Sequence, residues 1–126
     1  MVKPIYRADH VGSLLRSEIV QKTRKEYFTN KSIGIEELTN IEDNAIHELI
    51  KMQEETGLMV ATDGEQRRSF WHYDFMGQLL GLEMEEREPD QGVQFAGIKL
   101  RPIFPTIKDK IGFPDDHPHL QHFKFV

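Results

Sequence analysis

Residues 57–68 read Gly-Leu-Met-Val-Ala-Thr-Asp-Gly-Glu-Gln-Arg-Arg. The run from Leu58 to Ala61 is apolar without interruption, the pattern of a parallel strand buried on both faces. Two carboxylates and two guanidinium groups follow it, with Gly64 between the carboxylates. Because ligands bind at the carboxyl ends of parallel strands, this change of polarity predicts a site. A solvated turn is the alternative, since Asp-Gly is a common turn dipeptide.

A second stretch of the same design lies near the amino terminus. Residues 4–8 predict a first strand, and Asp9-His10-Val11-Gly12-Ser13 follows it. Gly12 would let backbone N–H groups approach a ligand closely, and the Ser13 hydroxyl can donate or accept a hydrogen bond. His10 either faces a ligand or is a structural histidine bonded to a neighbouring strand end.

Two helices are predicted between these stretches. The first begins after the N-cap Ser17 and runs to about Phe28, and the second runs from about Ile35 to Thr56. Gly57 suits the left-handed residue after a helix. The second helix carries an apolar stripe of Leu38, Ile41, Ala45, Leu49 and Met52, widened by Ile46. The predicted strands at 4–8 and 58–61, joined by a crossover that contains these two helices, would make a βαβ unit.

The remaining residues give weaker signals. The aromatic segment 69–76 predicts either a core or subunit interface, or a planar ligand that stacks on Trp71 or Tyr73. A short helix is expected to end near Gly81. Residues 83–88 predict a solvated edge strand or loop, 93–111 irregular strands, and 120–126 a final alternating strand. The cluster Asp115, Asp116, His117, His119 and His122 contains no helical pair of ligands, which disfavours a metal site.

Composition bounds the class of protein. The 126 residues fit one domain, residues 1–126. A net charge of −5 argues against a nucleic-acid-binding protein, and the short apolar runs predict no membrane span, so we expect a cytoplasmic chain. The absence of cysteine excludes a disulfide or a thiolate metal site within the chain.

The two polar stretches together resemble a known family. Residues 7–16, Arg-Ala-Asp-His-Val-Gly-Ser-Leu-Leu-Arg, and 62–71, Thr-Asp-Gly-Glu-Gln-Arg-Arg-Ser-Phe-Trp, are similar to the start of the cobalamin-independent methionine synthases, in particular the short single-barrel bacterial type. The resemblance implies the first strands and helices of a partial (β/α)8 TIM barrel, like that of the uroporphyrinogen decarboxylase superfamily. It also implies a methyltransferase that uses zinc to transfer a methyl group from methyl-folate to the thiol of homocysteine.

The resemblance also implies roles for individual residues. Gly12, Ser13 and Glu65 match the positions that contact the amino-acid substrate, and His10 and Arg68 are added to this substrate-binding set. Glu65 would bind the ammonium group of homocysteine, and Ser13 with a backbone N–H its carboxylate. Arg68 could instead form a structural salt bridge with Asp63 or Glu65. Residues 99–101 lie roughly where the family contacts folate.

The chain departs from the family in one large respect. The family's zinc ligands, two of them cysteines, lie in the carboxyl-terminal part of the barrel, and this chain has no cysteine and stops at Val126. A barrel needs about 250 residues. We therefore expect an amino-terminal portion that is inactive alone and self-associates through open barrel edges. The alternatives are a non-catalytic fragment or interaction module, and a related thiol alkyltransferase.

Overall fold

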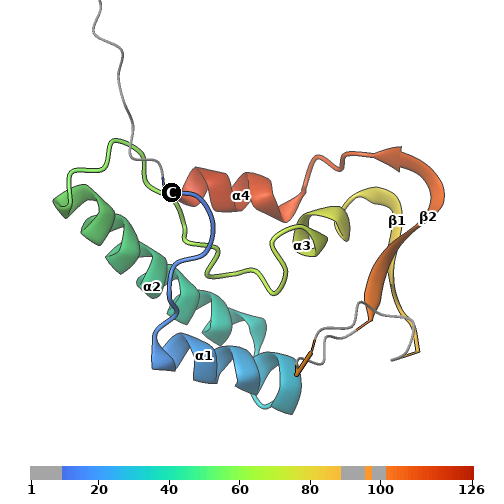
Figure 1. Cartoon of the computed structure of the whole chain (residues 1–126), viewed down its shortest axis with the longest axis horizontal. Helices are drawn as coiled ribbons and strands as arrows, with labels where there is room; N and C mark the ends of the chain where they lie inside the picture. Colours follow the sequence, from blue (N-terminus) through green and yellow to red (C-terminus); the bar gives the residue numbers. More distant parts are fainter. Residues whose placement is uncertain (1–9, 89–95, 98–101) are drawn as a thin grey trace, which may run out of the picture. The chain divides into compact units, whose positions relative to one another are not determined.

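The computed structural model describes residues 10–88, 96–97 and 102–126. Figure 1 shows the elements in chain order: α1 (Glu18–Lys25), a π-helical turn η1 (Glu26–Asn30), α2 (Ile35–Glu55), α3 (Tyr73–Met76), β1 (Leu80–Glu86), β2 (Ile103–Gly112) and α4 (Pro118–Phe125). The chain divides into two compact units, the first ending at Arg67 and the second running from Arg68 to Phe125. That residues 1–126 form one domain stays a prediction.

Both helices predicted in the first unit are confirmed. The hydroxyl oxygen of Ser17 accepts a hydrogen bond of 3.5 Å from the amide of Val20 and caps α1. α2 ends at Glu55 and is capped by Thr56, and the following residue, Gly57, has a φ of 82°. The Gly57 amide donates to the Glu54 carbonyl at 2.9 Å and the Leu58 amide to the Gln53 carbonyl at 3.1 Å, the pattern of a Schellman motif. Local signals therefore gave the start of α1 and the end of α2, whereas the end predicted at about Phe28 falls within the π-helical turn η1.

The buried face of α2 differs from the predicted apolar stripe. α1 and α2 lie side by side, and the apolar core of this unit is Val20, Leu38 and Ile46 (Figure 1). The buried residues of α2 are Leu38, Glu42, Ile46 and Gln53. Two polar side chains thus replace much of the expected stripe, because α2 packs against a polar loop and its hydrogen-bonding groups as well as against α1.

The predicted strand at Leu58–Ala61 is wrong in this structure. Met59 and Val60 form a bend in an irregular segment, and their side chains are 88% and 54% exposed. A strand needs a partner for its backbone groups, and the other predicted strand, residues 4–8, lies outside the described residues. The backbone amide and carbonyl of Thr62 pair instead with the side-chain amide of Gln53, at 3.0 and 2.9 Å.

The second unit is built on an antiparallel pair of strands. β1 pairs with β2 in the register Glu83↔Thr106, with a bulge between Leu80 and Leu82. Glu85 forms an ion pair with Lys108 and accepts a hydrogen bond of 2.7 Å from the Thr106 hydroxyl. Of the two alternatives for residues 83–88, a strand is observed as far as Glu86, in β1. The short helix expected to end near Gly81 ends earlier, since α3 covers Tyr73–Met76 and β1 begins at Leu80. In the described residues the sheet has two antiparallel strands, so the fold is a small α/β fold. That the chain forms part of a barrel stays a proposal.

The final predicted strand, residues 120–126, is also wrong, because Pro118–Phe125 forms α4. Pro118 stands at the first helical position, where its missing N–H costs nothing. In the described part of the chain, residues 120–126 pair with no strand. Alternation of apolar residues alone could not distinguish these two outcomes.

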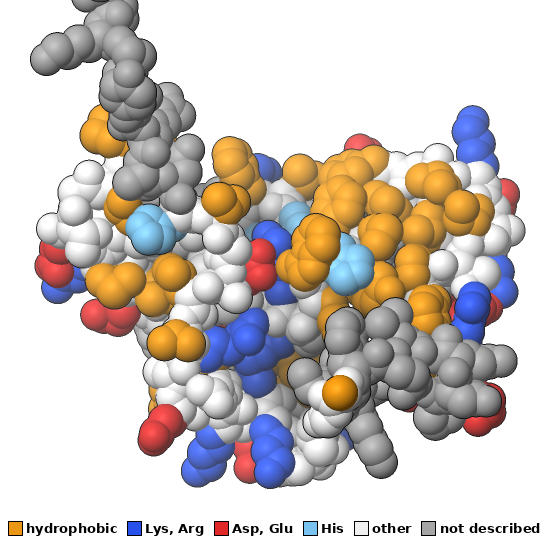
Figure 2. All heavy atoms as spheres, in the orientation of Figure 1, with side chains coloured by type: hydrophobic (Ala, Val, Ile, Leu, Met, Phe, Trp, Pro, Cys, Tyr) orange, Lys and Arg blue, Asp and Glu red, His pale blue; other side chains and the backbone are white. Residues whose placement is uncertain are grey.

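Many apolar side chains of the second unit are exposed. Figure 2 shows hydrophobic side chains gathered over this part of the molecule. The exposed members include Ile107 and Phe123, at 66% and 82%, and Trp71 at 68%. Among the described residues, no helix has the length and apolar character needed to cross a membrane.

Candidate functional site

The turn after Thr62 holds Glu65 in an unusual backbone conformation. Gly64 and Glu65 have φ values of 60° and 56°, the sign that a type I′ turn requires at both central residues. The Gln66 amide donates to the Asp63 carbonyl at 3.3 Å, and a carboxylate oxygen of Asp63 accepts from the Glu65 amide at 2.9 Å. A left-handed backbone is uncommon outside glycine and persists where surrounding contacts impose it.

The same turn is joined to the first polar stretch. The Leu14 amide donates to the Gly64 carbonyl at 2.9 Å, and the Gln66 side-chain amide donates to the Leu14 carbonyl at 3.0 Å. Leu14 follows Ser13 directly, and Gly64 precedes Glu65. Two segments about fifty residues apart in sequence are therefore bonded at positions adjacent to Ser13 and Glu65.

Two arginines hold the next three carbonyl groups of the turn. Arg16 donates through Nη2 to the Glu65 carbonyl at 2.7 Å and through Nε to the Gln66 carbonyl at 3.2 Å. Arg24, from α1, donates to the carbonyls of Gln66 and Arg67 at 3.2 and 2.9 Å. Cationic donors strengthen these bonds relative to neutral ones. The backbone of the turn is thus fixed from outside as well as by its own bonds.

A buried ion cluster anchors Arg24 and Arg67 to α2. Glu42 is 5% exposed and pairs with Arg24, and it lies 3.8 Å from Nη1 of Arg67. Arg67 also donates to Asp43 at 2.5 Å. Burial raises the pKa of the Glu42 carboxyl, an effect that outweighs the opposing attraction of Arg24 and Arg67. The cluster ties the end of the turn to the helix at a cost in desolvation.

The other predicted site residues lie in different settings. His10, Gly12 and Ser13 are exposed, and Glu65 is half-buried. Arg68 is the first residue of the second unit. Its Nη1 donates a hydrogen bond of 3.5 Å to the Trp71 carbonyl oxygen. Residues 99–101, considered for folate contact, lie outside the described residues.

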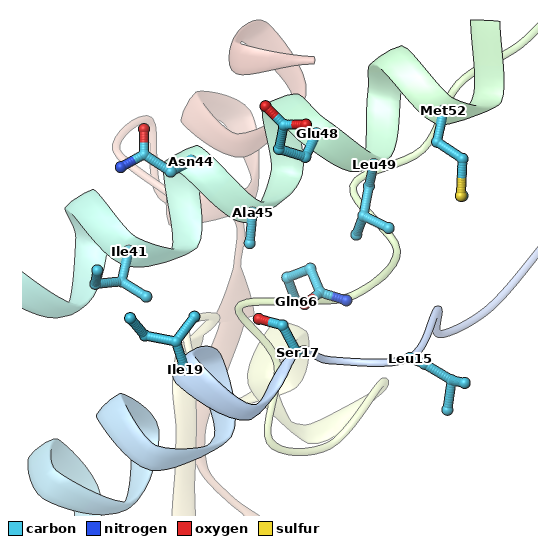
Figure 3. Close-up of a pocket in the computed structure, with 10 residues that line it drawn as sticks. All are labelled: Leu15, Ser17, Ile19, Ile41, Asn44, Ala45, Glu48, Leu49, Met52 and Gln66. Carbon is cyan, nitrogen blue, oxygen red and sulfur yellow. The ribbon is translucent and has the colours of Figure 1, made fainter. Parts of the chain in front are cut away.

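An open apolar groove of about 530 Å³ lies beside the turn in the first unit (Figure 3). Leu15 and Ile19 line one side, and residues of α2 line the other (Figure 3). Four members of the predicted helix stripe face this groove, namely Ile41, Ala45, Leu49 and Met52, whereas Leu38 and Ile46 lie in the core. Gln66 connects the groove with the turn, since its side chain lines the groove. None of the predicted substrate-binding residues lines it. The ten lining residues are Leu15, Ser17, Ile19, Ile41, Asn44, Ala45, Glu48, Leu49, Met52 and Gln66.

The residues that the structure describes do not fit a zinc ion. The sequence has no cysteine, and no three metal-ligating side chains of the described residues are placed together so that they could hold an ion. In the 115–122 cluster, both ring nitrogens of His117 are engaged: Nε2 lies 3.1 Å from the Phe75 carbonyl oxygen, and Nδ1 accepts from the His119 amide at 3.2 Å. His117 therefore has no free nitrogen for a metal.

Comparison with known proteins gives three informative similarities. Two Bacillus subtilis proteins, the uncharacterized proteins YxjG and YxjH, are 41% and 40% identical to this chain over 124 residues, which is 98% of this chain and 32% of each relative. A Listeria monocytogenes crystal structure, described as a "putative vitamin-B12 independent methionine synthase", is 34% identical with a TM-score of 0.70, over 95% of this chain and 31% of that one. The similarity to the Listeria structure supports the methionine synthase resemblance. The chain spans about a third of the length of these relatives. No family model matches the sequence.

Sequence reasoning missed the residues that hold the turn: Arg16, Arg24, Glu42 and Gln66. Arg24 and Glu42 stand at helical spacing from core residues, four positions after Val20 and Leu38 respectively. Opposite charges at core-facing positions of two neighbouring helices are a signal of a buried pair that could have been used. Arg16 and Gln66 stand in the quoted motifs, but their contacts are to backbone carbonyls, which residue types do not reveal.

Proposed function

We propose that this chain supplies amino-acid-binding elements of a methyltransferase of the cobalamin-independent methionine synthase type, which methylates the thiol of homocysteine. The observation that carries the proposal is the hydrogen bond between Leu14 and Gly64, because it joins the backbone beside Ser13 to the backbone beside Glu65. The similarity to the Listeria protein over 95% of the chain gives independent support.

The two side chains have complementary roles in binding an amino acid. The Glu65 carboxylate would accept charge-assisted hydrogen bonds from the substrate ammonium group. The Ser13 hydroxyl and backbone N–H groups near Gly12 would donate to the substrate carboxylate. Both segments are accessible, since Gly12 and Ser13 are exposed and Glu65 is half-buried. His10 and Arg68 belong to the proposed set with roles still to be separated.

Activation of the thiol is not assigned to residues of this chain. A cysteine-like thiol has a pKa of about 8.5 and is mostly protonated at neutral pH. Because the residues present do not fit zinc, the proposal assigns binding and orientation to this chain. The partial barrel and the methyl-folate donor belong to the same proposal, and self-association through open barrel edges is proposed for this chain itself.

Titration of L-homocysteine into the reduced protein, followed by amide chemical shifts, tests the binding proposal. We expect saturable shifts at the amides of residues 12–14 and 64–66. Glu65→Gln should weaken binding by about 1.5–3 kcal/mol, roughly 10- to 150-fold, the scale of a hydrogen bond to a charged group. Glu54→Gln, an exposed substitution on α2, is the matched control and should leave the affinity unchanged. Equal affinities of the Glu65→Gln variant and the parent would contradict the proposal.

The reaction itself is tested in YxjG, which is about three times as long as this chain. Methionine formation from homocysteine and a methylated folate supports the proposed reaction. Turnover with another thiol and none with homocysteine would replace it with a related thiol alkyltransferase. A lack of any turnover would favour a non-catalytic binding protein.

A further inference from the structure

Glu65 keeps a left-handed backbone although it carries a side chain. Its φ of 56° is a conformation that glycine adopts readily and other residues rarely adopt. The residue before it, Gly64, already supplies the flexibility that a sharp turn needs. Glu65 is the second left-handed residue of the turn and, unlike Gly64, it carries a Cβ. Its conformation must therefore be held by contacts with its surroundings.

The peptide plane before Glu65 is held at both of its polar groups. Its N–H, that of Glu65, donates to a carboxylate oxygen of Asp63 at 2.9 Å. Its carbonyl, that of Gly64, accepts from the Leu14 amide at 2.9 Å. Because a peptide unit is planar, these two bonds fix the orientation of the whole plane.

The peptide plane after Glu65 is held in the same way, with Arg16 providing one of the two bonds. The Gln66 amide donates to the Asp63 carbonyl at 3.3 Å, and the Glu65 carbonyl accepts from Nη2 of Arg16 at 2.7 Å. Nε of Arg16 reaches the next carbonyl, that of Gln66, at 3.2 Å. The planar guanidinium group thus spans two successive carbonyls in a fork that a lysine cannot reproduce.

We propose that Arg16 is a positioning residue for Glu65, holding its left-handed backbone and thereby the direction in which its carboxylate leaves the chain. The two planes flanking Glu65 define its φ and ψ, and these define the direction of its Cα–Cβ bond. The contribution to ligand binding rests on the proposed function; the conformational role does not. Arg16 is itself held, since its carbonyl accepts from the Gln21 side-chain amide at 2.9 Å.

The backbone torsion at residue 65, measured by NMR couplings and chemical shifts without ligand, tests this role. In Arg16→Ala we expect residue 65 to leave the left-handed region for most of the time. Arg16→Lys should restore it in part, because an ammonium group can reach one carbonyl. Arg87→Ala is the matched control, since Arg87 contacts the ring of Phe104 in the second unit and should leave residue 65 unchanged.

A second variant keeps the test decisive if Arg16→Ala folds poorly. Glu65→Gly removes the Cβ and with it the cost of positive φ. The loss of stability caused by Arg16→Lys should then be smaller in the Glu65→Gly background than in the parent. An unchanged φ at residue 65 in Arg16→Ala, or equal losses in the two backgrounds, overturns the proposal.

Homocysteine affinity separates this inference from the proposed function. If the binding-competent conformation falls to a tenth of the population, the apparent affinity falls about tenfold. We expect that loss in Arg16→Ala, together with the change in torsion. A parent protein that does not bind homocysteine contradicts the proposed function, while the torsion measurement still decides whether Arg16 positions Glu65.

Discussion

Gly64 lies so close to Leu14 that a Cβ atom built on Gly64 would be 2.8 Å from the Cβ of Leu14. The close approach accompanies the hydrogen bond between the Leu14 amide and the Gly64 carbonyl. Any side chain at position 64 would therefore push apart the two segments that carry Ser13 and Glu65.

Gly64→Ala should destabilise the protein by about 2–4 kcal/mol, since it adds a steric overlap to the strain of a positive φ. Gly57→Ala is the matched control: its φ is 82°, and no atom lies within 4 Å of the added Cβ. This control should cost about 1–2 kcal/mol. Urea unfolding measures both, and equal costs would show that the contact with Leu14 is loose.

Arg24→Ala should destabilise the protein by about 3–5 kcal/mol, because it leaves the buried Glu42 carboxylate without its nearest cation. It also removes two bonds to the turn carbonyls. The double variant Arg24→Ala/Glu42→Ala should recover part of the loss. Lys51→Ala, at an ion pair in which both side chains are 67% exposed, should change stability by about 0.5 kcal/mol or less. A small effect of Arg24→Ala in urea unfolding would contradict the structural role of the cluster.

The raised pKa of Glu42 predicts a particular pH dependence. Burial holds the folded pKa of Glu42 above the ordinary value of 4.5, so the folded state keeps its proton at pH values where the unfolded chain has released it. This contribution to stability is full below about pH 4.5 and is lost as pH rises through the folded pKa. Glu42→Gln cannot ionise, so its stability relative to the parent should increase as pH rises above about 4.5.

Glu26 provides a control of opposite sign. Hydrogen bonds from Ser32 and Asn30 lower the pKa of Glu26 below 4.5. Its contribution is present above the unfolded pKa and is lost as pH falls through the folded pKa. The parent should therefore gain stability as pH rises toward about 4.5, whereas Glu26→Gln should not. The stability of Glu26→Gln relative to the parent should decrease over this range. The same slope for both variants in urea unfolding would contradict the assigned causes.

His117→Ala should destabilise the second unit by about 2–4 kcal/mol. The imidazole is fully buried, donates to the Phe75 carbonyl and accepts from the His119 amide at the start of α4. The substitution removes this cap and one of the donors to the Phe75 carbonyl, which keeps its bond from the Gln78 amide at 3.2 Å, and it empties a buried site. His122→Ala, at a half-buried ring on α4, is the control and should cost less. Equal unfolding midpoints for His117→Ala and the parent would show that the ring is not needed.

Zinc should not stabilise this chain. A metal that binds the folded state raises its melting temperature with concentration, but both nitrogens of His117 already have partners and the chain has no cysteine. We expect no zinc after dialysis and no shift of the thermal unfolding midpoint with added zinc. Stoichiometric zinc retained by the protein would restore the 115–122 cluster as a metal site.

Failures of sequence reasoning occurred where an element depends on a distant partner. The apolar run at 58–61 and the alternating run at 120–126 both satisfied a strand pattern, but a strand exists only where another strand pairs with it. The Thr62 backbone found its partner in the Gln53 side chain, and residues 118–125 satisfied their own backbone as a helix. A helix closes its hydrogen bonds within one segment, which is why α1 and α2 were predictable.

The sequence by itself determined where α1 begins, at the cap Ser17, and where α2 stops, before Gly57. It also determined the polar turn at 62–67 and the absence of thiolate ligands. Caps, glycines and composition act locally, so these features can be read without knowledge of the packing. Only the tertiary structure decided which face of α2 is buried and which residues hold the turn. Arg16 and Arg24 donate to backbone carbonyls about fifty and forty residues away, and every residue offers the same carbonyl. Residue types therefore do not encode such contacts, and only the packing of α1, α2 and the turn selects them.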